Sequence, residues 1–405
     1  MNKMIHRFSL YGFLKNLKFF DPFLILFFRE AGLPFLHIGI LIAVRDISTN
    51  ILEIPTGIYA DAFGRRKSMV LSFISYIFSF LLFFAFLNYY AFLGAMILFG
   101  LGEAFRSGTH KAMILEYLRI HNKESQKVEY YGTTRAASEL GSAVSSLIAA
   151  GLVFYTGSYR YIFAAAVIPY MINVINLAMY PPELDGEICI NKNPIKQQLT
   201  QTLNDFIKIF KSFIAMKAII NSSLFKAYFK VTKDYLQPVL KMYALSLPVL
   251  LVLEETKRIS ITVGIVYFGI YLCTSYSSKS SARITNKFKD ITTAVNITYV
   301  TGGVLLVLAG IATEYKTELL AIAAFLFFYM LYNVRRPMTV SYVSDQISHK
   351  TMASGLSVES QVTTLFQAGI AVAIGALADV YGVGIALLVM GIFMVGGYPL
   401  IKVKE

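Results

Sequence analysis

Between two long apolar segments the chain reads Glu53-Ile-Pro-Thr-Gly-Ile-Tyr-Ala-Asp61-Ala-Phe-Gly64-Arg65-Arg66-Lys67. This order predicts the end of one membrane helix, a tight turn and the start of the next helix. Gly57 would let neighbouring backbones approach closely, and Gly64 would supply the turn. Asp61 is suited to accept hydrogen bonds from a helix N-terminus or to pair with a cation. Arg65 and Arg66 would hold the turn in the cytoplasm, because cytoplasmic loops are enriched in Lys and Arg.

The composition indicates a helical membrane protein. The 405 residues are 56% hydrophobic and 15% charged, with a mean hydropathy of +0.59, whereas a soluble domain has roughly 25% charged residues. Apolar runs of about 20 residues recur, and each is long enough to cross a bilayer as a helix. The formal net charge is +13, which in a soluble protein could suggest nucleic acid. Here the positive charge lies mostly between the apolar runs, so we expect membrane lipids and no nucleic acid as partners.

We predict an all-α polytopic protein with twelve transmembrane helices. The spans lie at roughly 15–32, 37–60, 69–88, 91–118, 133–155, 160–180, 222–245, 259–280, 292–312, 318–344, 356–378 and 382–401. With the N-terminus inside, the outer loops carry only Arg160, Lys257, Arg258 and Lys316, while the other loops are rich in Lys and Arg. This bias supports the count and predicts that both termini are cytoplasmic.

A polar, Lys-rich segment divides the chain. We predict an N-terminal six-helix half at 1–181, a cytoplasmic linker at 182–220 and a C-terminal six-helix half at 221–405. Within the linker, Asn204–Met216 can form an amphipathic helix along the inner leaflet. There is also a weak internal repeat. Arg106 is followed ten residues later by Glu116, and Arg335 is followed ten residues later by Asp345.

The turn between the second and third spans resembles the loop signature of the major facilitator superfamily, Gly-x-x-x-Asp-(Arg/Lys)-x-Gly-(Arg/Lys)-(Arg/Lys). The matching positions are Gly57, Asp61, Gly64, Arg65 and Arg66. Ala62 departs from the pattern, because the family usually has a cation there. The preceding Glu-Ile-Pro-Thr-Gly resembles a bacterial, drug- and solute-efflux-like group. The alternative is a basic turn that only fixes orientation.

The resemblance implies that the protein has two related six-helix halves. It also implies that the protein lies in a bacterial cytoplasmic (inner) membrane and is a monomer. It also implies that Glu116 pairs with Arg65 or Arg66 in a cytoplasmic gate. The predicted gating residues are Gly57, Asp61, Gly64, Arg65, Arg66 and Glu116. The alternative is that these are interfacial ion pairs, which contribute little.

Ionisable side chains within the spans are costly to bury, so each is a functional candidate. Positions 226, 230, 233, 234, 237 and 241 follow steps of three and four and form a polar stripe on one helix, which should face a water-filled cavity. The alternative for Lys226 and Lys230 is that they extend to the cytoplasmic interface. For Glu103 and Arg106, which share a face of span 4, the alternative is a structural pair. With the cavity helices that the resemblance implies, the predicted substrate-binding residues are Arg106, Lys230, Lys233, Asp234, Gln237 and Arg335.

A proton gradient is the expected energy source, because the chain has no nucleotide-binding P-loop pattern. A carboxylate can couple protons if it is neutral in one state and charged in the other. The candidates are Asp21 first, then Asp234, Glu139 and Asp46. Glu139 could instead simply pair with Arg135, one turn away.

These features predict a secondary active transporter that moves a small organic solute by alternating access. Arg106, Lys230, Lys233 and Arg335 outweigh Asp21, Asp234 and Glu103 in the expected cavity, which favours an anionic or zwitterionic solute. The family resemblance points to efflux, so the alternative is a proton-coupled exporter of lipophilic or cationic compounds.

Two other classes of protein are disfavoured. An intramembrane enzyme would need a nucleophile with a base or a metal cluster, and the sequence has no His-x-x-x-His, His-Glu-x-x-His or Gly-x-Ser-x-Gly pattern. Cys189 and Cys273 make no disulfide framework or metal site. We therefore expect no enzyme activity and no cofactor. A non-transporting sensor is the third class, and it is disfavoured because no appended domain of more than about 40 residues separates the spans.

Overall fold

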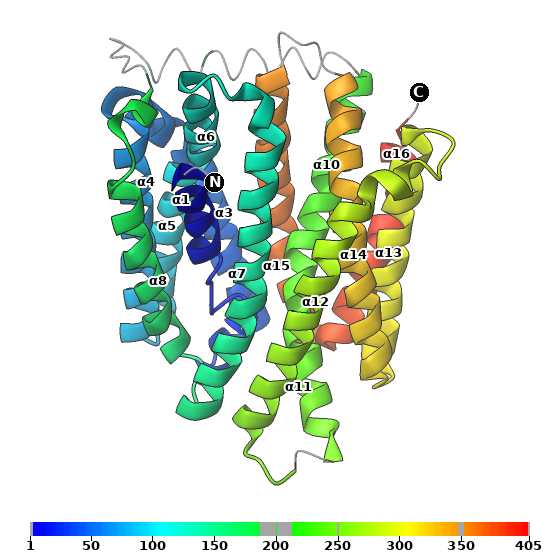
Figure 1. The fold of residues 1–405 in the computed structure, drawn as a ribbon. Coiled ribbons are helices and arrows are strands. Elements are labelled where there is room, and N and C mark those ends of the chain that lie inside the picture. The colour runs from blue at the N-terminus through cyan, green and yellow to red at the C-terminus, as the bar shows by residue number, and fades with distance from the viewer. Residues whose placement is uncertain (1–2, 187–199, 201–212, 249–250, 347–351, 404–405) are drawn as a thin grey trace. The chain divides into compact units, whose positions relative to one another are not determined.

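The structure is a computed structural model that describes residues 3–186, 200, 213–248, 251–346 and 352–403 (Figure 1). These residues form helices and connecting turns, with no strand among them. Eight of the described helices are long and apolar enough to cross a membrane. The amphipathic helix expected at Asn204–Met216 falls largely outside the described residues.

Eight α-helices precede the central polar segment (Figure 1). Their bounds are α1 Lys3–Lys15, α2 Leu24–Glu30, α3 Phe35–Phe63, α4 Arg65–Ala85, α5 Tyr89–Arg106, α6 Thr109–Ile120, α7 Lys127–Thr156 and α8 Tyr161–Ala178. Short 3₁₀ turns lie at η1 Glu124–Gln126 and η2 Pro182–Asp185.

The helices that follow are drawn from green to red in Figure 1. Their bounds are α10 Phe213–Thr232, η3 Lys233–Tyr235, α11 Leu236–Ser246, α12 Glu255–Thr285, α13 Ile291–Glu314, α14 Glu318–Asp345, α15 Met352–Gly396 and α16 Tyr398–Ile401. Spans 11 and 12 of the sequence prediction run together as α15, with a break at Gly382, whose φ of 87° is left-handed.

Three predicted spans are broken rather than continuous. The span at 15–32 is α1 and α2 joined by the non-helical residues 16–23, and α1 begins well before the predicted start. The span at 91–118 is α5 and α6, which separate where Gly108 takes a φ of 70°. The span at 222–245 is α10, η3 and α11. Pro238 lacks the N–H that would bond the Asp234 carbonyl four residues earlier, and the chain tightens into η3 there.

The described chain forms two compact units. Unit 1 comprises Met1–Phe27, Val44–Gln198 and Val263–Tyr271, and unit 2 comprises Phe28–Ala43, Leu199–Thr262 and Leu272–Glu405. The first turns of α3 therefore belong to unit 2. There the Asp379 carboxylate accepts hydrogen bonds from the backbone N–H groups of Phe35 (2.8 Å) and Leu36 (2.7 Å), so an α15 side chain satisfies otherwise unpaired donors at the α3 N-terminus.

The core of unit 1 is built from packed aromatic rings and from serine hydroxyl groups that donate hydrogen bonds to carbonyls of a neighbouring helix. Phe27 and Phe163 have ring centroids 4.6 Å apart. Along α4, the Ser72 hydroxyl donates to the carbonyl of Gly102 (2.6 Å) and the Ser79 hydroxyl to that of Ala95 (2.7 Å). Small polar residues of this kind allow membrane helices to pack closely, and they fix α4 beside α5.

The core of unit 2 is built from backbone contact between α13 and α15. A Cβ on Gly391 would lie 2.6 Å from the backbone N of Val307, so a larger residue there would push the helices apart. The C-terminal end is held by side chains. Asn296 bonds the carbonyl (2.9 Å) and N–H (3.1 Å) of Val403, and Asn221 donates to the carbonyl of Ile401 (3.1 Å).

Candidate functional site

Unit 1 gathers charged side chains where two helices break. Arg106, the last residue of α5, forms an ion pair with Glu103 and donates from Nε to the Tyr76 hydroxyl (3.1 Å). Lys18, in the turn between α1 and α2, places Nζ 3.7 Å from Glu103 Oε1. The side chains of Arg106, Glu103 and Lys18 are 24%, 22% and 22% exposed. The cluster is therefore only partly withdrawn from solvent.

Two further residues lie on the same elements. Asp21 is in the α1–α2 turn, is partly buried and donates its backbone N–H to the Lys18 carbonyl (3.0 Å). His110 is buried, stacks on Tyr11 with ring centroids 3.7 Å apart, and has Nε2 3.4 Å from the Tyr180 hydroxyl. His110 therefore serves ring packing on α6.

The other carboxylates considered for proton coupling in unit 1 pair locally. Glu139 Oε1 lies 3.0 Å from Arg135 Nε, one helical turn away on α7. Asp46 Oδ1 lies 2.9 Å from the guanidinium of the adjacent Arg45. Each pair lies on a single helix.

The turn between α3 and α4 forms a charged cluster with residues of α6 and η2. Gly64 has a φ of 98°, as the turn requires. The guanidinium of Arg65 lies 3.8 Å from Glu116 Oε2. Arg66 donates to Asp185 from its backbone N (2.8 Å) and from Nε (2.9 Å). The turn is thus tied to both α6 and η2.

Asp185 is a residue that the sequence analysis missed. It accepts the hydrogen bonds at the start of α4 and pairs with a cation, which are the tasks that the sequence suggested for Asp61. Asp61 itself is exposed near the end of α3. A Cβ on Gly57 would meet no atom of the described residues within 4 Å, so this structure makes no close backbone contact there among those residues. No local pattern in the sequence singles out Asp185, because its partner Arg66 lies 119 residues away.

In unit 2, η3 interrupts the predicted polar stripe. Lys233 and Asp234 form an ion pair with each other in η3. Neighbouring side chains in a regular α-helix face apart. At the break, the Lys233 side chain nevertheless contacts the carboxylate of Asp234, the next residue. Lys230 is exposed on α10, and Gln237 is fully buried on α11.

Another ion pair of the stripe joins α10 to α15, and Lys241, further along the stripe, pairs with Glu255 (3.0 Å). Lys226 Nζ lies 2.5 Å from Glu359 Oε1. Glu359 is 3% exposed. It also accepts a hydrogen bond from the Ser222 hydroxyl (2.5 Å). Sequence analysis missed Glu359, although a carboxylate four residues into a predicted span is a clear signal.

Arg335 is enclosed within unit 2, with 1% of its surface exposed. It donates to the Val295 carbonyl, to Asn221 Oδ1 and to Thr298 Oγ1 (2.6 Å). Its guanidinium lies over the rings of Phe225 (4.4 Å) and Tyr299 (5.5 Å). These partners are neutral, and no carboxylate of a described residue forms an ion pair with Arg335.

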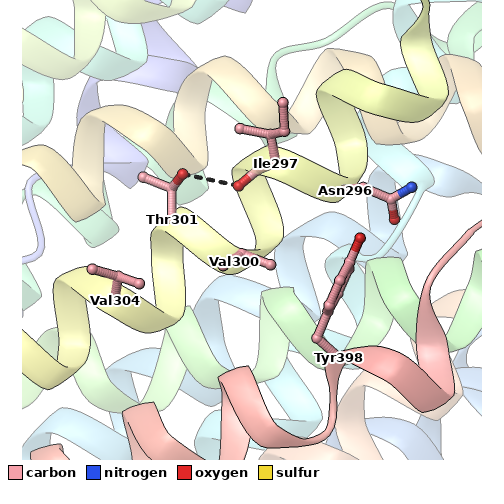
Figure 2. A pocket seen from close by; sticks show the side chains of 6 residues that line it. All are labelled: Asn296, Ile297, Val300, Thr301, Val304 and Tyr398. Carbon is pink, nitrogen blue, oxygen red and sulfur yellow. Dashed lines mark hydrogen bonds between the residues drawn. The ribbon is translucent and has the colours of Figure 1, made fainter.

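A groove of about 340 Å³ lies on unit 2 (Figure 2). It is lined by Asn296, Ile297, Val300, Thr301, Val304 and Tyr398. The lining carries no charged group, so the groove is distinct from the charged clusters. Among the described residues no group of three or more His, Cys, Asp or Glu side chains could hold a metal ion.

Comparisons with known proteins identify the family. The model of the Major Facilitator Superfamily matches residues 10–360. The uncharacterized MFS-type transporter YxaM of Bacillus subtilis (strain 168) is 32% identical over 90 residues, which are 22% of this chain and 23% of that protein. The alignment therefore spans about a quarter of that relative's length.

Solved transporters share the fold over their whole length. The nucleoside transporter NupG superposes with a TM-score of 0.77 at 12% identity, covering 100% of both chains. The D-xylose–proton symporter superposes with a TM-score of 0.75 at 15% identity, covering 99% of this chain and 98% of that one. These matches confirm the predicted all-helical membrane fold. The chain therefore belongs to the Major Facilitator Superfamily and is an integral membrane protein that shares the fold of these solved transporters.

Proposed function

We propose that the protein is a secondary active transporter that moves a small organic solute across a bacterial cytoplasmic membrane by proton-coupled alternating access. The observation that carries this proposal is the position of the charged side chains. Lys18 and Asp21 lie between α1 and α2, Arg106 ends α5, and Lys233 and Asp234 form η3.

Helix breaks support a solute site for a physical reason. Non-helical backbone at membrane depth is tolerated only where it is buried in protein or lines a water-filled cavity. Transporters use such breaks, because the freed backbone groups and helix ends bind ions and solutes. The superposed neighbours are named for a nucleoside and for D-xylose with protons, which supports a small polar solute here.

The charges favour an anionic or zwitterionic solute. Arg106 stands beside Glu103, and Lys233 beside Asp234, so both signs are available near each break. We propose that Arg106, Lys230, Lys233, Asp234 and Gln237 contact the solute. We propose that Arg335 acts on the same site from within unit 2 by holding α10 in place.

Proton coupling is assigned to Asp21, with Glu139 and Asp46 as the other candidates. Asp21 is favoured because it lies at a helix break, whereas Glu139 and Asp46 lie within continuous helices. A carboxylate whose surroundings change between states can take up and release a proton. Asp21→Asn should uncouple flux from the pH gradient, and a full response of that variant to the gradient would place coupling elsewhere.

The gate is assigned to the turn between α3 and α4, with Gly57, Asp61, Gly64, Arg65, Arg66 and Glu116. The pairs of Arg65 with Glu116 and of Arg66 with Asp185 are charge contacts of the kind that one state makes and another breaks. We propose that they are made when the cytoplasmic side is closed.

A thermal-shift screen of the purified protein tests the solute class. A ligand that binds the folded state raises its stability by mass action. We expect organic anions or zwitterions to stabilise the protein, and Arg106→Gln to remove the effect while Arg336→Gln, at an exposed position of α14, keeps it. Stabilisation by lipophilic cations alone would instead favour the multidrug exporter.

A further inference from the structure

We propose that Glu359 and Lys226 form a proton-controlled binding site for an organic carboxylate. This inference rests on the proposed transport function and adds a site that lies outside the helix breaks. Protonation of Glu359 would release the Lys226 ammonium, which would then bind the carboxylate group of the solute.

The geometry singles out this pair among the described ion pairs. Glu359 is the most buried charged partner, with 4% of its side chain exposed, whereas Lys226 keeps 21% of its side chain exposed. The Lys226 side chain is therefore partly accessible, whereas the Glu359 carboxylate that it contacts is enclosed. The Ser222 hydroxyl bonds the same Oε1 atom, at 2.5 Å.

A purely structural role explains this arrangement poorly. Burying two charges costs free energy that their attraction repays only partly, and apolar residues of similar size often stabilise a protein as well or better. The α10–α15 contact is already secured next to the pair, where the Ser223 hydroxyl donates to the Glu359 carbonyl (3.0 Å). A buried pair with one accessible partner fits a switch.

The proposed step conserves charge and atoms. A proton from the aqueous phase binds a carboxylate oxygen of Glu359, and the hydrogen bond from Lys226 to that carboxylate is lost. Lys226 keeps its positive charge and its three N–H donors. The pair changes from neutral to a net charge of +1, and binding one monovalent carboxylate restores neutrality. The protonated Glu359 and the Ser222 hydroxyl are then additional donors for the solute oxygens.

Other charged or titratable groups stand on the packed elements. On α10, Lys230 lies one turn from Lys226 and is exposed. On α14, Arg335 bonds Asn221, the residue before Ser222, and Tyr342 shares a buried cluster with Val358. Those on α13 include Tyr299, which lies against Arg335, Asp290, which caps that helix, and Glu314 at its other end. Lys226 is the cation paired with Glu359 among the described residues, so Glu359 is the group to test.

The test measures benzoate binding to the purified full-length protein between about pH 5 and pH 8. Because one proton accompanies one anion, the affinity of the wild type should increase as pH falls, by up to about tenfold per pH unit. Glu359→Gln mimics the protonated acid, so it should bind benzoate with little dependence on pH. Lys226→Gln should weaken binding about tenfold or more at every pH.

The matched control is the more accessible pair of Lys257 and Glu254, whose nitrogen and oxygen are 3.1 Å apart and whose side chains are 32% and 75% exposed. Lys257→Gln and Glu254→Gln should both bind as the wild type does. Lys226→Arg keeps the charge and should retain the pH dependence, which guards against a loss of binding through misfolding. An infrared difference spectrum supplies an independent readout, since benzoate should increase the carboxylic-acid C=O band in the wild type and not in Glu359→Gln.

Three results would overturn the proposal: no benzoate binding by the wild type at the acidic end, the wild-type pH dependence in Glu359→Gln, or unchanged affinity in Lys226→Gln. Each leaves the transporter proposal standing as long as the wild type moves a solute in liposomes. Absence of all solute flux would instead contradict the proposed function.

Discussion

Arg106 and Arg335 occupy corresponding places in the internal repeat, yet their surroundings differ. Arg106 ends a helix, pairs with the carboxylate of Glu103 and keeps 24% of its side chain exposed. Arg335 lies inside α14, is 1% exposed and bonds neutral groups on α10 and α13. The comparison teaches that position in a repeat does not assign a role. The partners of the side chain do.

The energetics of burial indicate different roles for the two arginines. A buried cation without a counter-ion costs several kcal/mol, and for Arg335 this cost is offset by hydrogen bonds to a charged donor, about 1.5–3 kcal/mol each. Contact with ring faces adds about 2 kcal/mol when desolvated. Arg335 therefore joins three helices of unit 2, whereas Arg106 can exchange partners at low cost.

The largest expected effect is on the stability of unit 2. Arg335→Gln should lower the free energy of unfolding by about 3 kcal/mol, because it leaves Asn221 and Thr298 without their donor. Thermal unfolding of the detergent-purified protein measures this, with Arg336→Gln, next to it and exposed, as the control. Equal melting temperatures for Arg335→Gln and Arg336→Gln would contradict the structural role assigned to Arg335.

The second effect concerns transport. Arg106→Gln should reduce solute flux about tenfold or more and change the free energy of unfolding by about 1 kcal/mol or less, because its ion pair is partly solvated. Flux into liposomes, normalised to folded protein, measures this. If Arg106→Gln instead had a clearly lower melting temperature and normal flux, Arg106 would have a structural role and the assignment to the solute site would be wrong.

A smaller effect separates Asp185 from Asp61 at the turn between α3 and α4. Asp185→Asn should cost about 1 kcal/mol of stability, because it weakens the contacts at the α4 N-terminus and with Arg66. Asp61→Asn should leave stability unchanged and abolish flux. Melting curves and flux of the two variants side by side test this, and normal flux in Asp61→Asn would remove Asp61 from the gate.

The smallest effect is a pH dependence at the N-terminus of α13. Hydrogen bonds from the Thr293 backbone and hydroxyl hold the pKa of Asp290 below its usual value. A lowered pKa in the folded state means that the charge stabilises at neutral pH and that this contribution is lost as pH falls through the acidic range below about 4. The difference in melting temperature between wild type and Asp290→Asn should therefore vanish on acidification. A difference that grows toward low pH would contradict the assignment.

Sequence reasoning reached the membrane fold because apolar runs of about 20 residues dominate the chain. It missed the breaks at residues 16–23 and at Gly108, because a window that averages hydropathy over a span does not detect one left-handed residue. The Arg65–Glu116 contact was expected from the family resemblance, and the structure contains it.

The missed residues share one cause. Asp185 acts on a turn 119 residues away, and Glu359 pairs with a lysine 133 residues away. The enclosure of Arg335 likewise depends on Asn221 and Thr298 from other helices. Such roles follow from packing, which no local pattern encodes. Glu359 alone could have been found, by applying the rule on intramembrane charges to every span.

The most direct test of the account is proton movement in proteoliposomes that contain the purified protein and an internal pH indicator. Addition of anionic or zwitterionic organic solutes should move protons with the solute in the wild type and in Arg336→Gln. The signal should fall about tenfold or more in Arg106→Gln. A proton signal that appears only with lipophilic cations would contradict the claim that the charged helix breaks bind the solute. A signal that is unchanged in Arg106→Gln would contradict it as well.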